Sequence, residues 1–127
     1  MTMPKFFICK QCGSILNVVT DGKEPMTCCT QKMQELVPNT VDAAQEKHVP
    51  VVTVDGNMVH VAVGSVAHPM LPEHYIQFIY LQTAAGGQMK TLKPGDKPEA
   101  TFALTEGDKA IAAYEYCNLH GLWLKEI

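Results

Sequence analysis

The sequence predicts an all-β protein, with a small metal-stapled N-terminal module followed by an immunoglobulin-like antiparallel β-sandwich. Beyond residue 37, short β-branched and aromatic runs alternate with turn signals at a spacing of roughly ten residues, which is typical of such sandwiches. No amphipathic helical pattern lies between these runs. Four of the five cysteines fall before residue 30. We therefore expect a four-cysteine module over residues 1–37 and a sandwich domain over residues 38–127.

Each strand of the sandwich is predicted from its composition and from the turn that ends it. Residues 51–54 are β-branched and stop at Asp55-Gly56-Asn57, and residues 58–63 resume with valine at every second position. Later strands are expected at residues 75–82, 88–92, 99–104, 110–116 and 122–125, separated by turns rich in glycine, proline and charge. Residues 37–45 have no clear period and contain Pro38-Asn39-Thr40, so they are predicted to be the linker.

Composition excludes several classes of protein. The chain has 127 residues, 46% of them hydrophobic, and a net charge of −3. The hydrophobic content supports a packed core. The negative net charge argues against a nucleic-acid-binding protein, which usually has a basic face. We find no signal peptide and no apolar run long enough for a membrane helix. A cytoplasmic, reducing location is therefore expected, where clustered cysteines are ligands more often than disulfides.

The N-terminal cysteines have the spacing of a four-sulfur metal site. Cys9 and Cys12 form a C-x-x-C pair, which is answered by the adjacent Cys28 and Cys29. Iron and zinc both suit four thiolates, and the alternatives are two disulfides or three ligands with one buried bystander. Neighbouring residues of an extended chain point to opposite faces, so the backbone must kink at Cys28–Cys29 if both bind one ion.

A second set of ligand residues is spread over the rest of the chain: His48, His68, His74, Cys117 and His120. One thiolate with four imidazoles is too nitrogen-rich for a structural zinc finger. It suits a redox-active ion that keeps one position open for a substrate. The fifth histidine, His60, lies in a predicted strand on the face opposite the valines, and we interpret it as a surface residue rather than a ligand.

Together these motifs resemble desulfoferrodoxin, the two-iron form of superoxide reductase. Besides the four N-terminal cysteines, the resemblance depends on Glu46-Lys47-His48-Val49-Pro50, Gly64-Ser65-Val66-Ala67-His68-Pro69-Met70, Glu73-His74-Tyr75-Ile76, Leu92-Lys93-Pro94-Gly95 and Tyr116-Cys117-Asn118-Leu119-His120-Gly121-Leu122-Trp123. It covers essentially the whole chain, with the motifs in the family's order. The N-terminal part is similar to desulforedoxin, and the C-terminal part to the one-iron enzyme neelaredoxin.

The resemblance implies iron at both sites. It places the four histidines in the equatorial plane of the second iron and Cys117 on its axis. It further implies that superoxide is reduced by one electron to hydrogen peroxide, that Lys47 attracts superoxide and helps to deliver a proton, and that Glu46 binds the oxidised iron. A rubredoxin-type electron donor and a homodimer are also implied.

Charge counting agrees with an anionic substrate. A ferrous ion with four neutral imidazoles and one thiolate has a net charge of about +1, and Lys47 adds positive potential beside it. The alternative function is a metal-binding electron carrier without catalysis. Blue-copper carriers use fewer histidines than this chain offers. The alternative for Lys47 and Glu46 is that they are surface residues without a role in the reaction.

Overall fold

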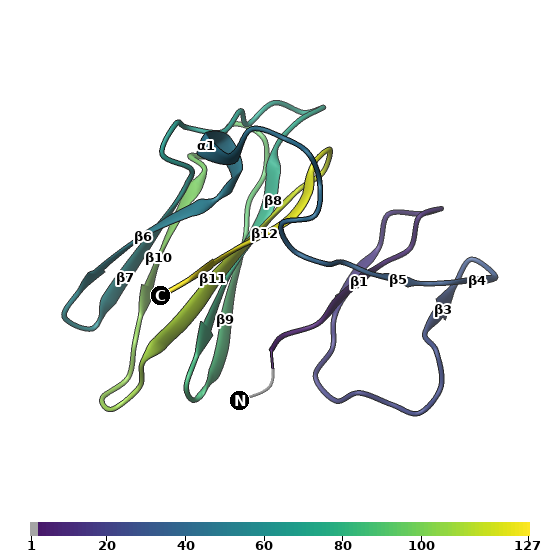
Figure 1. The fold of residues 1–127 in the computed structure, drawn as a ribbon, viewed down its shortest axis with the longest axis horizontal. Helices are drawn as coiled ribbons and strands as arrows, with labels where there is room; N and C mark the ends of the chain where they lie inside the picture. The colour runs from purple at the N-terminus through teal and green to yellow at the C-terminus, as the bar shows by residue number, and fades with distance from the viewer. Residues whose placement is uncertain (1–2) are drawn as a thin grey trace. The chain divides into compact units, whose positions relative to one another are not determined.

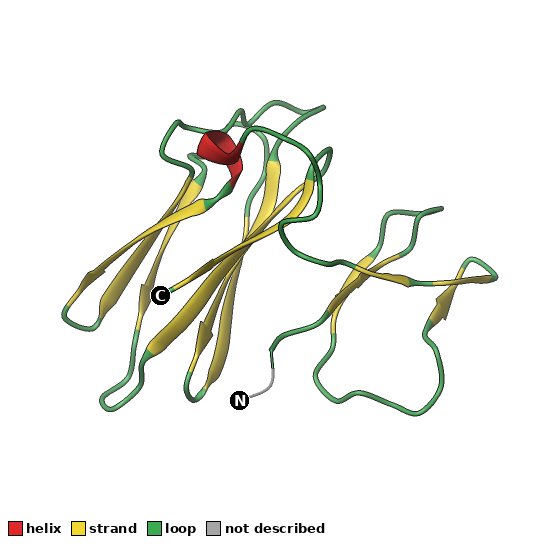
Figure 2. Cartoon of the chain, in the orientation of Figure 1, coloured by secondary structure: helices red, strands yellow, loops and turns green. Residues whose placement is uncertain are grey.

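The computed structural model describes residues 3–127, and the chain divides into two compact units, Met1–Val37 and Pro38–Ile127 (Figure 1). Regular structure in the described residues is almost entirely β-strand, with one short helix (Figure 2). The predicted all-β class is therefore confirmed. None of the helical segments in the described part of the chain has the length and apolarity needed to cross a membrane.

The N-terminal unit is built from very short strands. β1 (Phe6–Ile8) pairs with β2 (Ile15–Asn17) and β5 (Gln34–Glu35), while β3 (Thr27–Cys28) and β4 (Gln31–Lys32) form a hairpin. Its buried hydrophobic residues are Phe6, Cys9 and Met33. A core this small contributes little stability, so a unit of this size depends on a metal or a partner to stay folded.

The C-terminal unit is a sandwich of two antiparallel sheets. One sheet has the order β10-β7-β6 and the other β12-β11-β8-β9. The strands of the two sheets are β6 (Pro50–Asp55), β7 (Met58–Val63), β8 (Ile76–Thr83), β9 (Gly86–Thr91), β10 (Glu99–Ala103), β11 (Ala110–Cys117) and β12 (Gly121–Glu126). All seven strands expected from the sequence are present. The sequence did not predict α1 (Gln45–His48), because a helix of 4 residues is too short to show a period.

The core lies between the two sheets and accounts for the alternation seen in the sequence. Val59, Val61 and Val63 of β7 are at most 1% exposed. They belong to one buried cluster with residues of the other sheet, including Ile79 of β8 and Ala113 of β11. Burying these side chains between the sheets is the main favourable contribution to the stability of this unit.

Antiparallel pairing brings several chain segments to one end of the sandwich. Pro50 at the start of β6 pairs with Val63 at the end of β7, and Ile76 at the start of β8 pairs with Cys117 at the end of β11. Cys117 also pairs with Gly121 at the start of β12. The helix α1, the loop of residues 64–75 and the turn of residues 118–120 therefore meet at the end that is uppermost in Figure 1.

Candidate metal centres

The first pair of sulfurs is presented by a tight turn after β1. The N–H of Gly13 donates to the carbonyl of Cys9 at 2.8 Å, and the N–H of Cys9 donates to the carbonyl of Ser14 at 2.9 Å. Gly13 has a φ of 81°, a left-handed conformation that glycine adopts without steric cost. The turn folds Cys12 back toward Cys9.

The second pair lies at the β3–β4 hairpin, where the predicted kink is present. Cys28 pairs with Gln31, so the turn consists of Cys29 and Thr30, whose φ angles are 52° and 61°. Two-residue hairpins of this kind need positive φ at both positions, and β-branched residues rarely adopt it. The turn aims two adjacent side chains the same way, leaving Cys28 Sγ and Cys29 Sγ 3.8 Å apart.

The four sulfurs fit a tetrahedral metal. They all lie within 4.8 Å of one another, and Cys12 Sγ is 3.5 Å from Cys28 Sγ. Tetrahedral thiolates at ordinary metal–sulfur distances are about 3.8 Å apart. Hydrogen bonding to Cys9, and then to Cys12 and Cys29, raises the pKa of Cys28 to about 12, whereas Ser14 lowers the pKa of Cys12 to about 6. Sulfurs this close are not all thiolates unless a cation neutralises them, so the cluster suits a bound metal ion.

The second centre is a closed cycle of four imidazole rings. Each ring stands nearly perpendicular to the next: His48 to His68 at 75°, His68 to His74 at 82°, His74 to His120 at 78° and His120 to His48 at 90°. Ring centroids of neighbours are between 4.6 and 5.1 Å apart. Together with Cys117, the ligand atoms all lie within 4.8 Å of one another, so the structure brings together all five predicted ligands.

Hydrogen bonds at the second ring nitrogens show which atoms face the centre. Nδ1 of His48 lies 2.7 Å from the carbonyl of Ala44, and Nδ1 of His68 lies 2.6 Å from that of Pro69. A carbonyl only accepts, so both Nδ1 atoms bear the proton and both Nε2 atoms are bare lone pairs. These two lone pairs face each other at 3.2 Å. Such an arrangement is repulsive unless a cation lies between them, and it fits a bound metal.

The other two rings complete the donor set. His74 Nε2 is buried without a hydrogen-bond partner among the described residues, whereas His120 turns Nδ1 inward, 3.1 Å from His48 Nε2. Three histidines thus present Nε2 and one presents Nδ1. Burial lowers the pKa of His48, His68 and His74, that of His68 to about 4. Neutral imidazoles are the form that binds metal, so burial prepares these rings as ligands.

Cys117 lies at the end of β11 and is fully buried. Its Sγ is 3.9 Å from His120 Nδ1. Burial raises the pKa of Cys117, while the backbone N–H groups of Leu119 and His120 lower it. The N–H groups of these two residues therefore point at the sulfur. Hydrogen bonds of this kind reduce the electron donation of a thiolate to its metal.

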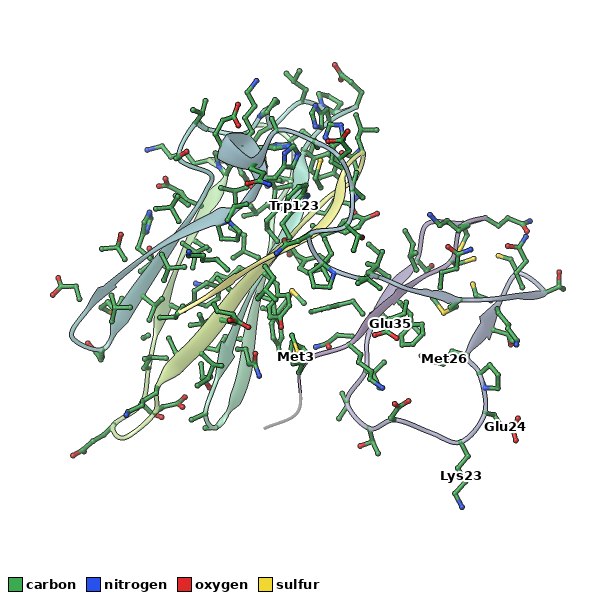
Figure 3. The ribbon with its side chains drawn as sticks, viewed as in Figure 1. Met3, Lys23, Glu24, Met26, Glu35 and Trp123 are labelled. Carbon is green, nitrogen blue, oxygen red and sulfur yellow. The ribbon has the colours of Figure 1, made fainter. Side chains whose placement is uncertain are left out.

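Trp123 packs against the ring cycle, a role that sequence reasoning missed. Its indole stacks on His48 with ring centroids 5.1 Å apart, and its Nε1–H donates to the carbonyl of His120 at 3.0 Å. Figure 3 shows Trp123 inside the C-terminal unit. Since Trp123 lies on β12, one side chain fixes the positions of two ligands that are far apart in the sequence.

Glu115 is a second feature that sequence reasoning missed. It is 0% exposed, and neither of its carboxylate oxygens has a hydrogen-bond partner in the described part of the chain. Desolvation raises its pKa well above the usual value, so the group is held in its neutral form. Because a charged Glu115 raises the pKa of Cys117, the burial that favours the neutral form of Glu115 also favours the Cys117 thiolate.

The loop of residues 64–75 holds α1 against the sandwich. The N–H of Val66 donates to the carbonyl of Glu46 at 2.9 Å, and the hydroxyl of Ser65 contacts the same oxygen at 3.3 Å. A Cβ placed on Gly64 would lie 2.7 Å from this carbonyl and 3.0 Å from that of Val49. Only glycine allows the loop and the helix to approach so closely.

The two remaining predicted site residues are exposed and lie on α1. Burial is the main cause of the lowered pKa of His48 and of His74, and the positive charge of Lys47 lowers both further. The Lys47 ammonium group therefore acts on the ring cycle. Glu46 is tied in place by its backbone, and it lines a groove of about 490 Å³ beside β6 and the end of β12. His60 lies apart from both centres, with Nδ1 2.9 Å from the Thr101 hydroxyl.

Comparison with known proteins agrees with this geometry. The desulfoferrodoxin family model matches residues 40–126. The desulfoferrodoxin of Syntrophotalea carbinolica is 48% identical over 93% of this chain and 92% of its own, and the superoxide reductase of Pyrococcus horikoshii is 36% identical over 65% of this chain and 86% of its own. The crystal structure of the superoxide reductase from Treponema pallidum superposes with a TM-score of 0.84 at 43% identity, covering 98% of this chain and all of that one.

An all-β protein with one four-sulfur and one histidine-rich centre is the class that fold and site define. The chain belongs to the desulfoferrodoxin family. The superoxide reductase (1Fe-SOR) from Giardia intestinalis matches 65% of this chain and 97% of its own length, with a TM-score of 0.55 and 34% identity.

Substituting Gly64 tests the close contact that positions His48. In Gly64→Ala the new methyl group meets two backbone carbonyls, so α1 must shift; we expect a loss of about 1–3 kcal/mol in the free energy of unfolding. Iron bound at the histidine site should fall in parallel, measured by absorption and metal analysis. Gly22→Ala is the control, because a Cβ at Gly22 meets nothing within 4 Å. Equal iron content in both variants would contradict the role of Gly64.

The lowered histidine pKa values predict how pH changes the stability of the metal-free protein. His68 has a folded-state pKa of about 4, against about 6.5 in an unfolded chain. The unfolded chain thus binds more protons in this window, and the stability from His68 is lost as pH falls from 6.5 towards 4. Glu115, with its raised pKa, acts in the opposite direction, so wild type is compared with His68→Gln by urea unfolding. The stability difference between them should change between pH 7 and pH 5, with wild type losing more; a constant difference would contradict the assignment.

Proposed function

We propose that this protein is a superoxide reductase, which reduces superoxide by one electron to hydrogen peroxide without releasing dioxygen. The observation that carries the proposal is the cycle of four imidazoles closed around one point with the buried Cys117 sulfur beside it. His48 and His68 are buried, whereas His74 and His120 are half-buried, so a small anion has access from the side of the latter two. Kinship with named superoxide reductases supports the same activity.

The ligand atoms follow from the ring geometry. We infer that iron is held by Nε2 of His48, His68 and His74, by Nδ1 of His120 and by Sγ of Cys117. Ferrous iron bound there supplies the electron that reduces superoxide. A second iron fits the thiolates of Cys9, Cys12, Cys28 and Cys29. Four protein ligands leave that centre no position for a substrate, so its role is electron transfer. Residues 1–37 then form the electron-transfer module and residues 38–127 the catalytic domain.

Lys47 and Glu46 are the residues we assign to the reaction itself. The Lys47 ammonium group attracts the superoxide anion toward the ring cycle and transfers a proton toward it through water. Two protons and one electron convert superoxide to hydrogen peroxide. Glu46 is proposed to supply a carboxylate ligand when the site is oxidised, because a more positive ion binds a carboxylate better. This requires the exposed Glu46 side chain to turn from the groove toward the rings.

The remaining expectations from the family resemblance concern the surroundings of the enzyme. We propose that electrons arrive from a rubredoxin-type protein, that two chains form a homodimer, and that the protein acts in the cytoplasm. The small core of the N-terminal unit supports the dimer, because a unit with so few buried residues is stabilised by contact with a partner.

Metal content and reaction stoichiometry test the proposed function. The purified protein should contain about two irons per chain, one for each donor set. Prereduced protein mixed with superoxide should form one peroxide for each superoxide consumed, with no matching dioxygen. Equal yields of peroxide and dioxygen would show dismutation instead, and iron-loaded protein that fails to react would indicate a non-catalytic electron carrier.

Removing the positive charge of Lys47 tests electrostatic steering. Lys47→Ala should lower the second-order rate constant with superoxide by about 10-fold at low ionic strength, and by less as salt screens the charge. Iron content should be unchanged. Lys23→Ala, which makes the same change in net charge in the N-terminal unit (Figure 3), is the control. The steering role of Lys47 is excluded if the two variants react at the same rate, measured by pulse radiolysis.

A further inference from the structure

Asn118 directly follows Cys117 and binds the segment that holds His74. Its side-chain oxygen accepts a hydrogen bond from the N–H of Tyr75 at 2.9 Å, and its side-chain nitrogen donates to the carbonyl of Glu73 at 3.0 Å. Its own backbone N–H donates to the carbonyl of Tyr75 at 3.3 Å. One residue therefore holds the backbone on both sides of His74.

His74 depends on such contacts more than its neighbours in the cycle do. The rings of His48 and His68 are each fixed at Nδ1 by a backbone carbonyl. For His74, in contrast, no ring hydrogen bond is found within residues 3–127, and its buried Nε2 has no partner. Its backbone closes a tight turn with Leu71 through two hydrogen bonds of 2.9 and 3.0 Å. The direction of the His74 ring is thus set through its backbone, by that turn and by Asn118.

We propose that Asn118 is a positioning residue, which couples His74 to the end of β11 that presents Cys117. The inference rests on the proposed function in one respect, namely that these two side chains bind the same iron. Because Ile76 pairs with Cys117 across β8 and β11, the side chain of Asn118 extends this strand pairing beyond the sheet. The histidine and the cysteine are thereby held at a fixed separation before metal binds.

Loss of this contact has a predictable effect on the metal. Residues that orient metal ligands typically change metal affinity by about 10- to 100-fold when they are removed. Asn118→Ala removes both side-chain hydrogen bonds, so iron should leave the histidine site at least about 10-fold faster. Asn118→Asp keeps the acceptor for Tyr75 but faces the carbonyl of Glu73 with an oxygen, so its rate should be intermediate.

The experiment uses the iron-loaded protein. Iron is transferred to a strong chelator, and the loss of the thiolate-to-iron absorption of Cys117 is followed in time. The four-sulfur centre in the same sample reports on the N-terminal unit and should be unaffected. Asp108→Ala is the matched control, since Asp108 also binds backbone N–H groups, those of Ala85 and Lys109 at 3.0 and 2.8 Å, but at the opposite end of β8. Urea unfolding of every variant gives its global stability.

The proposal predicts faster iron release in the order Asn118→Ala, Asn118→Asp, wild type, with Asp108→Ala equal to wild type even where its stability is lower. A shifted thiolate-to-iron band in Asn118→Ala would support it further. It is overturned if release from Asn118→Ala matches wild type, or if release in all variants simply follows their loss of stability. Wild-type protein without a thiolate-to-iron band would instead contradict the proposed function itself.

Discussion

Mutual repulsion between converging lone pairs is the constraint on which this molecule depends. The Nε2 atoms of His48 and His68 face each other without a proton between them, because their Nδ1 protons are committed to backbone carbonyls. The four N-terminal sulfurs present the same problem in another form. Each cluster is unfavourable by itself, so the fold must hold it together until a cation makes it favourable.

The sandwich meets this constraint with antiparallel pairing. Strand ends that are far apart in the sequence become neighbours, and the ligands are placed on the short segments that join them. These segments are tied down locally: α1 by the loop around Gly64, and His48 and His120 by Trp123. The N-terminal unit has only a small core, and two tight turns position its sulfurs, one at Gly13 and one at Cys29–Thr30. Cys29 and Thr30 both have positive φ, a backbone conformation that persists only where the surroundings support it.

Much of this architecture is predictable from sequence because the signals are local. Valine at every second position of β7 predicts a half-buried strand, and a C-x-x-C answered by two adjacent cysteines predicts a four-sulfur site. The five side chains that gather at the second centre are predictable from their residue types and the motifs around them. In contrast, the inward nitrogen of each ring, the amides that face Cys117, the stack of Trp123 on His48 and the burial of Glu115 depend on contacts between distant segments. A single sequence has no periodicity or spacing that encodes them, and α1 is too short to show a helical period.

An anomalous-diffraction map of the iron-loaded protein, recorded at the iron absorption edge, shows whether the four histidines and Cys117 bind one ion. We expect one iron peak about 2.1 Å from each of four imidazole nitrogens and about 2.3 Å from Cys117 Sγ, and a second peak among the N-terminal sulfurs. An iron bound to fewer than four of these histidines, or one beyond bonding distance of Cys117, would contradict this expectation.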